Sequence, residues 1–167
     1  EHASKALRCN RQVAIAAVRQ DGEALQFASQ ELREDEEVAL AALEQNWRSH
    51  RYVAPGLWLN SEFCHRAVQR SWRVLSILPP EQTCKRALVE CALRQNGRAL
   101  EFASAELRMD PDVVLLAVRQ AWQAASFALG PARRDRTVLL AAGRLPRSRS
   151  RSTTRHAENQ VGRRRSL

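Results

Sequence analysis

The sequence lacks the features that mark a membrane protein or a familiar catalytic site. No apolar run approaches the roughly 20 residues that a membrane helix requires, so we expect a soluble chain that makes no membrane contact. No glycine-rich phosphate loop and no G-x-S-x-G turn occurs, and the histidines lack a repeated acidic or nucleophilic partner. We therefore expect a protein that is not an enzyme, with no catalytic residue and no cofactor.

The four cysteines also lack the spacing of a metal site, because none of them forms a C-x-x-C pair. Cys64 and His65 would need two further ligands to hold zinc, and the sequence offers no convincing pair. Cys64 and Cys91 lie within an apolar helical pattern, where a free cysteine behaves as a small hydrophobic residue. We interpret the cysteines as buried structural thiols and predict no metal site.

Acidic residues are scarce only at the C-terminal end. Residues 1–143 contain 19 Lys/Arg and 17 Asp/Glu, whereas residues 144–167 contain eight arginines and one acid, Glu158. The net charge of +9 is therefore mostly a property of this tail. Arg/Ser alternation and the lack of an apolar pattern predict a disordered, basic tail over residues 144–167.

Residues 1–143 contain an internal repeat. Residues 17–38, AVRQDGEALQFASQELREDEEV, return 75 positions later as residues 92–113, ALRQNGRALEFASAELRMDPDV, with 14 of 22 positions identical. The period is 25, and units start near residues 13, 38, 63, 88, 113 and 138. A fixed period of this length is typical of a repeat array. The opening ASKALRCN matches the end of a unit, and the chain begins with Glu1 and no signal segment. We therefore expect part of a longer repeat protein.

Each unit has the start and stop signals of two short helices. Short polar residues that can accept a hydrogen bond at a helix start precede the apolar runs, and Lys85 alone breaks this column. The column contains Asn10, Asp35, Asn60, Asp110 and Asp135. Gly22 and Gly97 follow the first helix, where we predict that they adopt the left-handed conformation of a helix C-cap. A second, shorter helix follows, and its apolar column is predicted to fill the gap between adjacent helices. That column contains Phe27, Tyr52, Ile77, Phe102 and Phe127.

This pattern predicts an all-α fold, an α-solenoid of about five to six 25-residue helical hairpins. The units, which read roughly V-x-x-A-V-x-Q-x-G-x-A-L-x-F-A-S-x-E-L-R-x-D, resemble a tandem-repeat family known only as a domain of unknown function, family 4116. The resemblance covers about residues 3–143. It is strongest at residues 13–38 and 88–118 and weakens across residues 47–87. The resemblance implies an all-helical repeat with no assigned reaction, and it supplies no catalytic residues.

Two polar or aromatic columns are candidates for a binding face. Trp47, Trp72 and Trp122 replace the capping glycine, so we expect the helix end to be built differently there. These side chains either pack between units or form a row of aromatic anchors for a peptide or for bases. Glutamines form the second column, and they either bond a neighbouring turn or read bases as in helical-repeat RNA binders. The column contains Gln20, Gln45, Gln95 and Gln120.

Together these features favour a non-catalytic binding or scaffold module that recognises a protein or peptide. The alternative is an RNA-binding protein that uses the arginine-rich tail and the helical face. RSRSRS at residues 147–152 and RRRSL at residues 163–167 resemble phosphorylated segments. The candidate phosphorylation sites are Ser148, Ser150, Ser152 and Ser166. We expect an intracellular location, cytoplasmic or nuclear.

Overall fold

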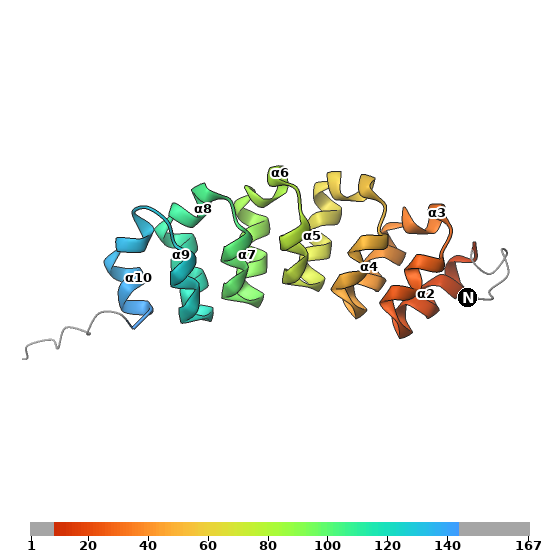
Figure 1. Cartoon of the computed structure of the whole chain (residues 1–167), viewed down its shortest axis with the longest axis horizontal. Coiled ribbons are helices and arrows are strands. Elements are labelled where there is room, and N and C mark those ends of the chain that lie inside the picture. Colours follow the sequence, from red (N-terminus) through yellow and green to blue (C-terminus); the bar gives the residue numbers. More distant parts are fainter. Residues whose placement is uncertain (1–8, 144–167) are drawn as a thin grey trace, which may run out of the picture.

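The computed structural model describes residues 9–143, which form an all-helical protein without strands. Six long helices start 25 residues apart and lie side by side in one row, from red to blue in Figure 1. They are α2 (Arg11–Gln20), α4 (Glu36–Gln45), α5 (Ser61–Arg70), α7 (Arg86–Gln95), α9 (Pro111–Gln120) and α10 (Arg136–Ala141). We call the segments that begin with the first five helices units 1 to 5: residues 11–35, 36–60, 61–85, 86–110 and 111–135. The predictions for residues 1–8, for the tail over residues 144–167 and for its four serines lie outside the described residues.

The long helices begin at the polar residues that the sequence indicates. The Asn10 side chain accepts hydrogen bonds from the backbone N–H groups of Gln12 and Val13, and so satisfies donors that have no partner within the helix. Equivalent bonds start four other long helices, at Asp35, Asn60, Asp110 and Asp135. Lys85 makes no such bond before α7. The predicted caps, including the exception, are confirmed.

The prediction for the end of the long helix was wrong. Gly22 and Gly97 do not adopt a left-handed conformation, which among the described glycines belongs to Gly130 and Gly143. We also expected the helix to end differently in the units that have tryptophan in place of glycine. The backbone of the residue before each tryptophan is extended, as it is at Asn96 before Gly97, so the helix ends in the same backbone conformation in both kinds of unit.

Gly22 and Gly97 are glycines because the next unit lies against them. A Cβ on Gly97 would lie 2.1 Å from the carbonyl oxygen of Ala117, and one on Gly22 would lie 2.6 Å from that of Ala42. Real Cβ atoms essentially never approach another atom so closely. Glycine is therefore present at these two positions because neighbouring units approach closely there, and not because the backbone adopts a left-handed turn.

Each unit contains three helical pieces, not the predicted two. A six-residue 3-10 helix follows each long helix: η1 (Gly22–Phe27), η2 (Trp47–Tyr52), η4 (Trp72–Ile77), η5 (Gly97–Phe102) and η6 (Trp122–Phe127). A third short piece then leads to the next cap: α3 (Gln30–Arg33), η3 (Pro55–Leu59), α6 (Pro80–Thr83), α8 (Ala105–Met109) and η7 (Ala132–Arg134). The segment read as a turn is therefore itself helical.

The core lies between the long helices and the 3-10 helices. One alanine of each central long helix is fully buried at the contact with its neighbours: Ala42, Ala67, Ala92 and Ala117. The 3-10 helices contribute Leu25, Leu75 and Leu100. The aromatic column predicted to fill this gap does not do so, since Phe27 is 42% exposed and the other four members are half-buried at the edge of the core. The smaller residues that precede them in the 3-10 helix occupy the interior.

Backbone hydrogen bonds connect the third pieces of successive units. Ala54 N–H donates to the Arg33 carbonyl, Ser104 N–H to Thr83, and Leu129 N–H to Arg108. At the equivalent position between units 2 and 3 stands Pro79, which has no N–H to donate. The row bends so that the short helices α3, α6 and α8 lie on its convex side (Figure 1). The C-terminal ends of the long helices therefore meet the 3-10 helices on the concave side.

Candidate binding surface

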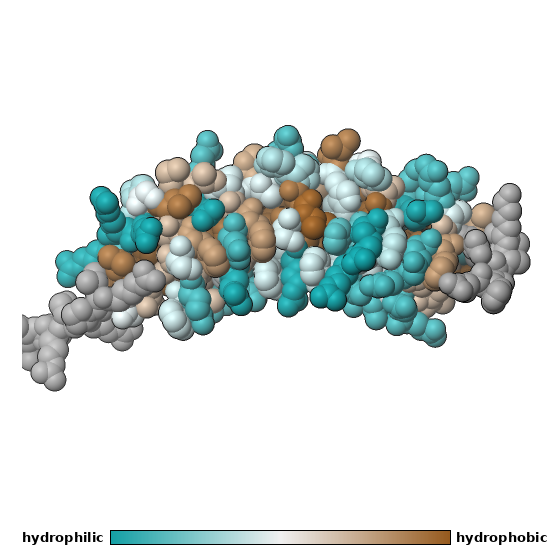
Figure 2. Space-filling model, viewed as in Figure 1, coloured by the Kyte–Doolittle hydropathy of each residue, from teal (hydrophilic) through white to brown (hydrophobic). Residues whose placement is uncertain are grey.

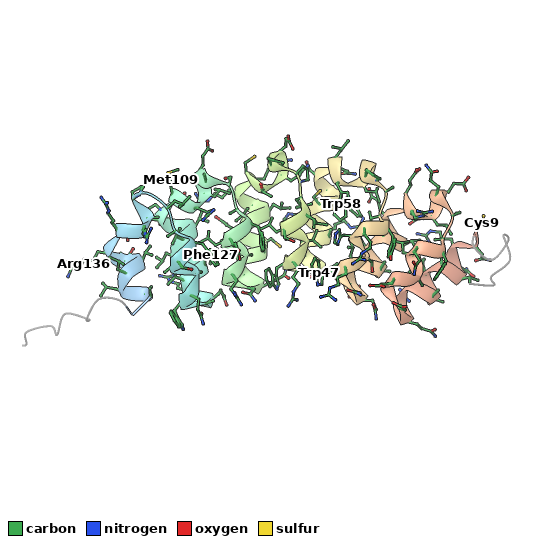
Figure 3. All side chains as sticks on the ribbon, in the orientation of Figure 1. Cys9, Trp47, Trp58, Met109, Phe127 and Arg136 are labelled. Atoms are coloured by element: carbon green, nitrogen blue, oxygen red, sulfur yellow. The ribbon has the colours of Figure 1, made fainter. Side chains whose placement is uncertain are left out.

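The three tryptophans of the predicted face share a position but have different environments. Trp47, at the start of η2, lies close to the concave side (Figure 3) and stacks on His50 with ring centroids 5.6 Å apart. Trp72 packs against the core, and the Arg73 guanidinium lies over its ring at 5.0 Å. Trp122 is 61% exposed. Of these three tryptophans, Trp122 is therefore open to solvent, and the rings of Trp47 and Trp72 already contact a neighbouring side chain.

Two of the predicted glutamines bond a neighbouring turn. The Gln45 amide oxygen accepts from Gly22 N–H at 2.7 Å, and its nitrogen donates to the Gln20 carbonyl at 3.2 Å. Gln95 repeats this contact, with Trp72 N–H as donor at 3.0 Å and the Val68 carbonyl as acceptor at 2.6 Å.

These bonds cap the end of the preceding long helix. Gln45 and Gln95 are nevertheless exposed and not buried, as is Gln20. For Gln120 no side-chain hydrogen bond is seen within residues 9–143, and this glutamine is also exposed. The glutamine column therefore joins units where its amides are bonded, and its outer side remains open to solvent.

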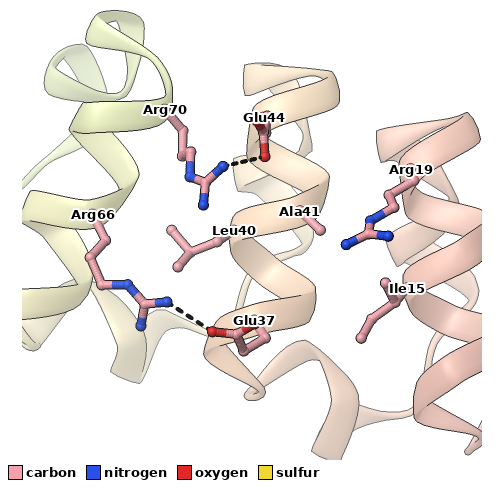
Figure 4. A pocket seen from close by; sticks show the side chains of 8 residues that line it. All are labelled: Ile15, Arg19, Glu37, Leu40, Ala41, Glu44, Arg66 and Arg70. Carbon is pink, nitrogen blue, oxygen red and sulfur yellow. Dashed lines mark hydrogen bonds and ion pairs between the residues drawn. The ribbon is translucent and has the colours of Figure 1, made fainter.

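A shallow cavity of about 120 Å³ lies between α2, α4 and α5 (Figure 4). Ion pairs between α4 and α5 cross it: Arg66 bonds Glu37 at 2.9 Å, and Arg70 bonds Glu44 at 2.6 Å. The remaining walls are Ile15, Arg19, Leu40 and Ala41. Most of the charges around this cavity are therefore paired within the protein.

Further along the chain, the concave side has a different charge. The turns that end the long helices of units 3, 4 and 5 span residues 69–74, 94–99 and 119–124, and they contain no Asp or Glu. They contain five arginines: Arg70, Arg73, Arg94, Arg98 and Arg119. We call this set the arginine edge. The corresponding turns of units 1 and 2 carry Asp21, Glu23 and Glu44 beside their arginines. In the space-filling view, hydrophilic residues line much of the lower rim of the row (Figure 2).

The arginine edge is not apparent from the total charge of residues 1–143, which is nearly balanced. The acids lie mainly at the opposite ends of the long helices. Asp35 accepts from Arg11 at 2.7 Å, and Asp110 accepts from Arg86 at 2.6 Å. The Arg11 side chain, together with backbone N–H groups, holds the pKa of Asp35 below its usual value. A count of charges by position within the unit would have revealed this segregation.

The cysteines fit the structural interpretation only in part. Cys64 is fully buried, and burial raises the pKa of its thiol to about 11. Cys91 is half-buried, whereas Cys9 and Cys84 are exposed, so the prediction of buried thiols is wrong for those two. Over the described range, no group of three or more potential ligands could hold a metal ion. No helix in that range is both long and apolar enough to cross a bilayer.

Comparison with known proteins gives a family and no closer relative. No curated protein and no solved structure matches the chain. One family model, described as a domain of unknown function (DUF4116), matches residues 1–33, 10–57 and 86–129. The unmatched interval between these segments, residues 58–85, overlaps the stretch in which the repeated motif weakens. These matches cover more than half of the sequence, and the chain therefore belongs to the DUF4116 family.

Proposed function

We propose that this protein is an α-solenoid of helical repeats that serves as a non-catalytic binding or scaffold module for proteins or peptides. The observation that carries the proposal is the placement of equivalent turns in a row on the concave side of the molecule (Figure 1). Stacked units create an extended concave surface. The solvent-exposed side chains on it can differ from unit to unit, because only the buried side chains are needed for packing between units. Such a surface suits an elongated partner.

Two cavities in the described part of the chain are smaller than a typical small-molecule site. The one between α2, α4 and α5 measures about 120 Å³, and a second, bordered by Gln30, Tyr52 and Pro55, measures about 270 Å³. Sites for small molecules usually enclose roughly 300 to 1,000 Å³ and bury most of the ligand. Both cavities fall short of that range. The exposed free thiols of Cys9 and Cys84 fit the reducing interior of a cell, which we include in the proposal.

RNA binding is the second candidate, and the arginine edge is the observation that favours it. Sequence-tolerant RNA binders combine a basic track with aromatic side chains on which bases stack. The rings of Trp47 and Trp72 each contact a neighbouring side chain, His50 and Arg73. Trp122 is the more open platform. This arrangement supports a peptide more strongly than a row of stacked bases.

A selection from a random peptide library on the immobilised full chain tests the proposal. We expect enrichment of a common motif, and saturable binding of the matching synthetic peptide by isothermal titration calorimetry. An Ala92→Asp variant provides the control, because a charge at this fully buried position should unfold the units and abolish binding. Failure to enrich any motif, together with RNA affinity that falls steeply with salt, would replace peptide recognition by RNA binding.

A further inference from the structure

The arginine edge combines exposed positive charge with open aromatic surface. Arg94, Arg98 and Arg119 are exposed, and within the described part of the chain their side chains form no ion pair or hydrogen bond. Arg70 bonds Glu44, and Arg73 lies over Trp72. Trp122 lies in the last turn of the edge, at the start of η6, and is 61% exposed. The edge thus offers unpaired guanidinium groups in two consecutive units, next to an exposed indole.

This charge pattern is complementary to an anionic partner. The guanidinium group binds carboxylates through paired N–H donors, and it does so most strongly where no acid of the same protein competes. Asp110, at the opposite end of α9, and Glu90, within α7, both accept from Arg86, so these acids are already paired away from the edge. No residue of the edge itself can neutralise Arg94, Arg98 or Arg119, because the three turns contain no acid.

The spacing of the units selects the conformation of the partner. Packed helices lie about 8 to 10 Å apart, so equivalent arginines of successive units should repeat at about that distance. A polyproline II segment has three residues per turn and a rise of about 3.1 Å, which returns every third side chain to the same side about 9 Å further on. An acid at every third residue of such a segment therefore matches one unit of the row. Its prolines would pack on an exposed indole, as in other aromatic-lined grooves that bind this conformation.

We infer that the arginine edge binds an acidic, proline-containing peptide segment in the polyproline II conformation, with Asp or Glu at every third residue. This inference rests on the proposed function and names its partner class. One or two arginines in each turn suit one carboxylate per unit. A nucleic acid strand would also need aromatic side chains on which successive bases stack, and among the tryptophans of the edge only Trp122 is open.

Fluorescence anisotropy with two labelled peptides tests the spacing. The peptide EPPEPPEPP has an acid at every third residue, and EEEPPPPPP has the same composition with the acids clustered. We expect the full chain to bind the spaced peptide at least about tenfold more tightly at roughly 0.15 M salt. Equal affinity for the two peptides would overturn the inference, because charge alone would then explain the binding.

Two triple variants test the location. Arg94→Ala/Arg98→Ala/Arg119→Ala removes the free charges of the edge, and we expect at least about a tenfold loss of affinity for the spaced peptide. Arg133→Ala/Arg134→Ala/Arg136→Ala removes the same charge from exposed positions at the opposite ends of the units and should leave affinity within about twofold. Circular dichroism verifies that both variants fold. The basic residues 144–167 are present in every variant, so they cannot produce the difference.

Three outcomes separate the possibilities. Equal losses in the two triple variants would show that binding depends on overall charge and would refute the edge as a site. Tighter binding of a twelve-nucleotide oligouridine than of the spaced peptide, lost only in the edge variant, would make the edge a nucleic-acid interface and overturn the peptide. If the library selection yields a motif whose binding survives loss of the three arginines, peptide recognition stands and this inference falls.

Discussion

Gly97 in unit 4 and Trp72 in unit 3 occupy the same place, directly after the long helix, yet they make different junctions. The backbone leading to them is the same, with φ of −156° at Asn96 and −154° at Ser71. After Gly97 the next unit presses its Ala117 carbonyl against the backbone. After Trp72 the space is occupied by an indole, and the contact is made by the Gln95 side chain. The same backbone conformation therefore leads into two kinds of junction between units. In a close junction, as at Gly97, backbone atoms of the two units are in contact, and in a spaced junction, as at Trp72, side chains make the contact.

The two kinds of junction also differ at the opposite end of the long helix. Both glycine units begin with an arginine that bonds the cap of the next unit, Arg11 to Asp35 and Arg86 to Asp110. In the tryptophan units 2 and 3 the first residue instead accepts from the next cap position, Glu36 from Asn60 and Ser61 from Lys85. What distinguishes the close junctions at this end is therefore an arginine–aspartate ion pair. The interval between the close junctions is the one in which the motif weakens and in which Pro79 removes a backbone bond.

The largest expected effect comes from forcing a close junction open. Gly97→Trp should cost about 3 kcal/mol or more in the free energy of unfolding, because even its Cβ would lie 2.1 Å from the Ala117 oxygen. Urea denaturation followed by circular dichroism measures the change. Gly56→Ala is the control, since nothing lies within 4 Å of a Cβ there, and it should change stability by less than about 1 kcal/mol. Similar midpoints for the two variants would contradict the close junction.

The reverse substitution should be costly for another reason. Trp72→Gly removes a side chain that packs against the core and carries Arg73, and the neighbouring unit is not positioned to fill the gap. We expect a loss of about 2 kcal/mol by the same urea assay. Trp122→Gly removes a side chain that is 61% exposed and should cost less than about 1 kcal/mol. Equal losses of unfolding free energy in Trp72→Gly and Trp122→Gly would contradict the interpretation that Trp72 stabilises its junction through burial.

This comparison also shows what a sequence can reveal about such a molecule. Period, polar caps and apolar columns act within one unit, so the long helices and the caps at Asp35 and Asp110 were predictable. The role of Gly97 was not, because a glycine after a helix looks the same whether it supplies a left-handed turn or admits a neighbour. The tryptophan and glutamine columns were found as candidates, but which members are exposed depends on the next unit. The charge segregation behind the arginine edge could be found by counting charges at each position of the unit, but the total charge of residues 1–143 conceals it.

A smaller effect is expected from the glutamine that spans the spaced junction. Gln95→Leu leaves the Trp72 N–H and the Val68 carbonyl without this partner at a rim that water reaches, so the loss should be about 1 kcal/mol. Gln120→Leu should change stability by less than about 0.5 kcal/mol, because the Gln120 amide makes no hydrogen bond seen in the described residues. Hydrogen exchange at the Trp72 amide gives a local measurement. Unchanged protection of this amide in Gln95→Leu would show that the Gln95 side chain does not bond the Trp72 N–H.

The smallest effect concerns the pairs that close the glycine junctions at their other end, and its sign follows from the pKa of Asp35. The bond from Arg11 holds this pKa below the usual value of about 3.9, so the unfolded chain takes up the proton at a higher pH than the folded one. The stability contributed by the pair is therefore complete above about pH 5 and is lost as the pH falls through the folded pKa.

Asp35→Asn isolates this contribution because asparagine caps a helix as well as aspartate does, as Asn60 shows in the next unit. We expect the variant to be less stable by up to about 1 kcal/mol at pH 7, the range of exposed ion pairs, and the difference to shrink toward zero near pH 2.5. Urea midpoints of both proteins across this pH range measure it. Asp110→Asn should behave alike, since Arg86 bonds Asp110 as Arg11 bonds Asp35 and its pKa is also lowered. A difference that instead widened in acid would mean that the carboxylate destabilises the close junction, and the arginine would then have to be assigned another role.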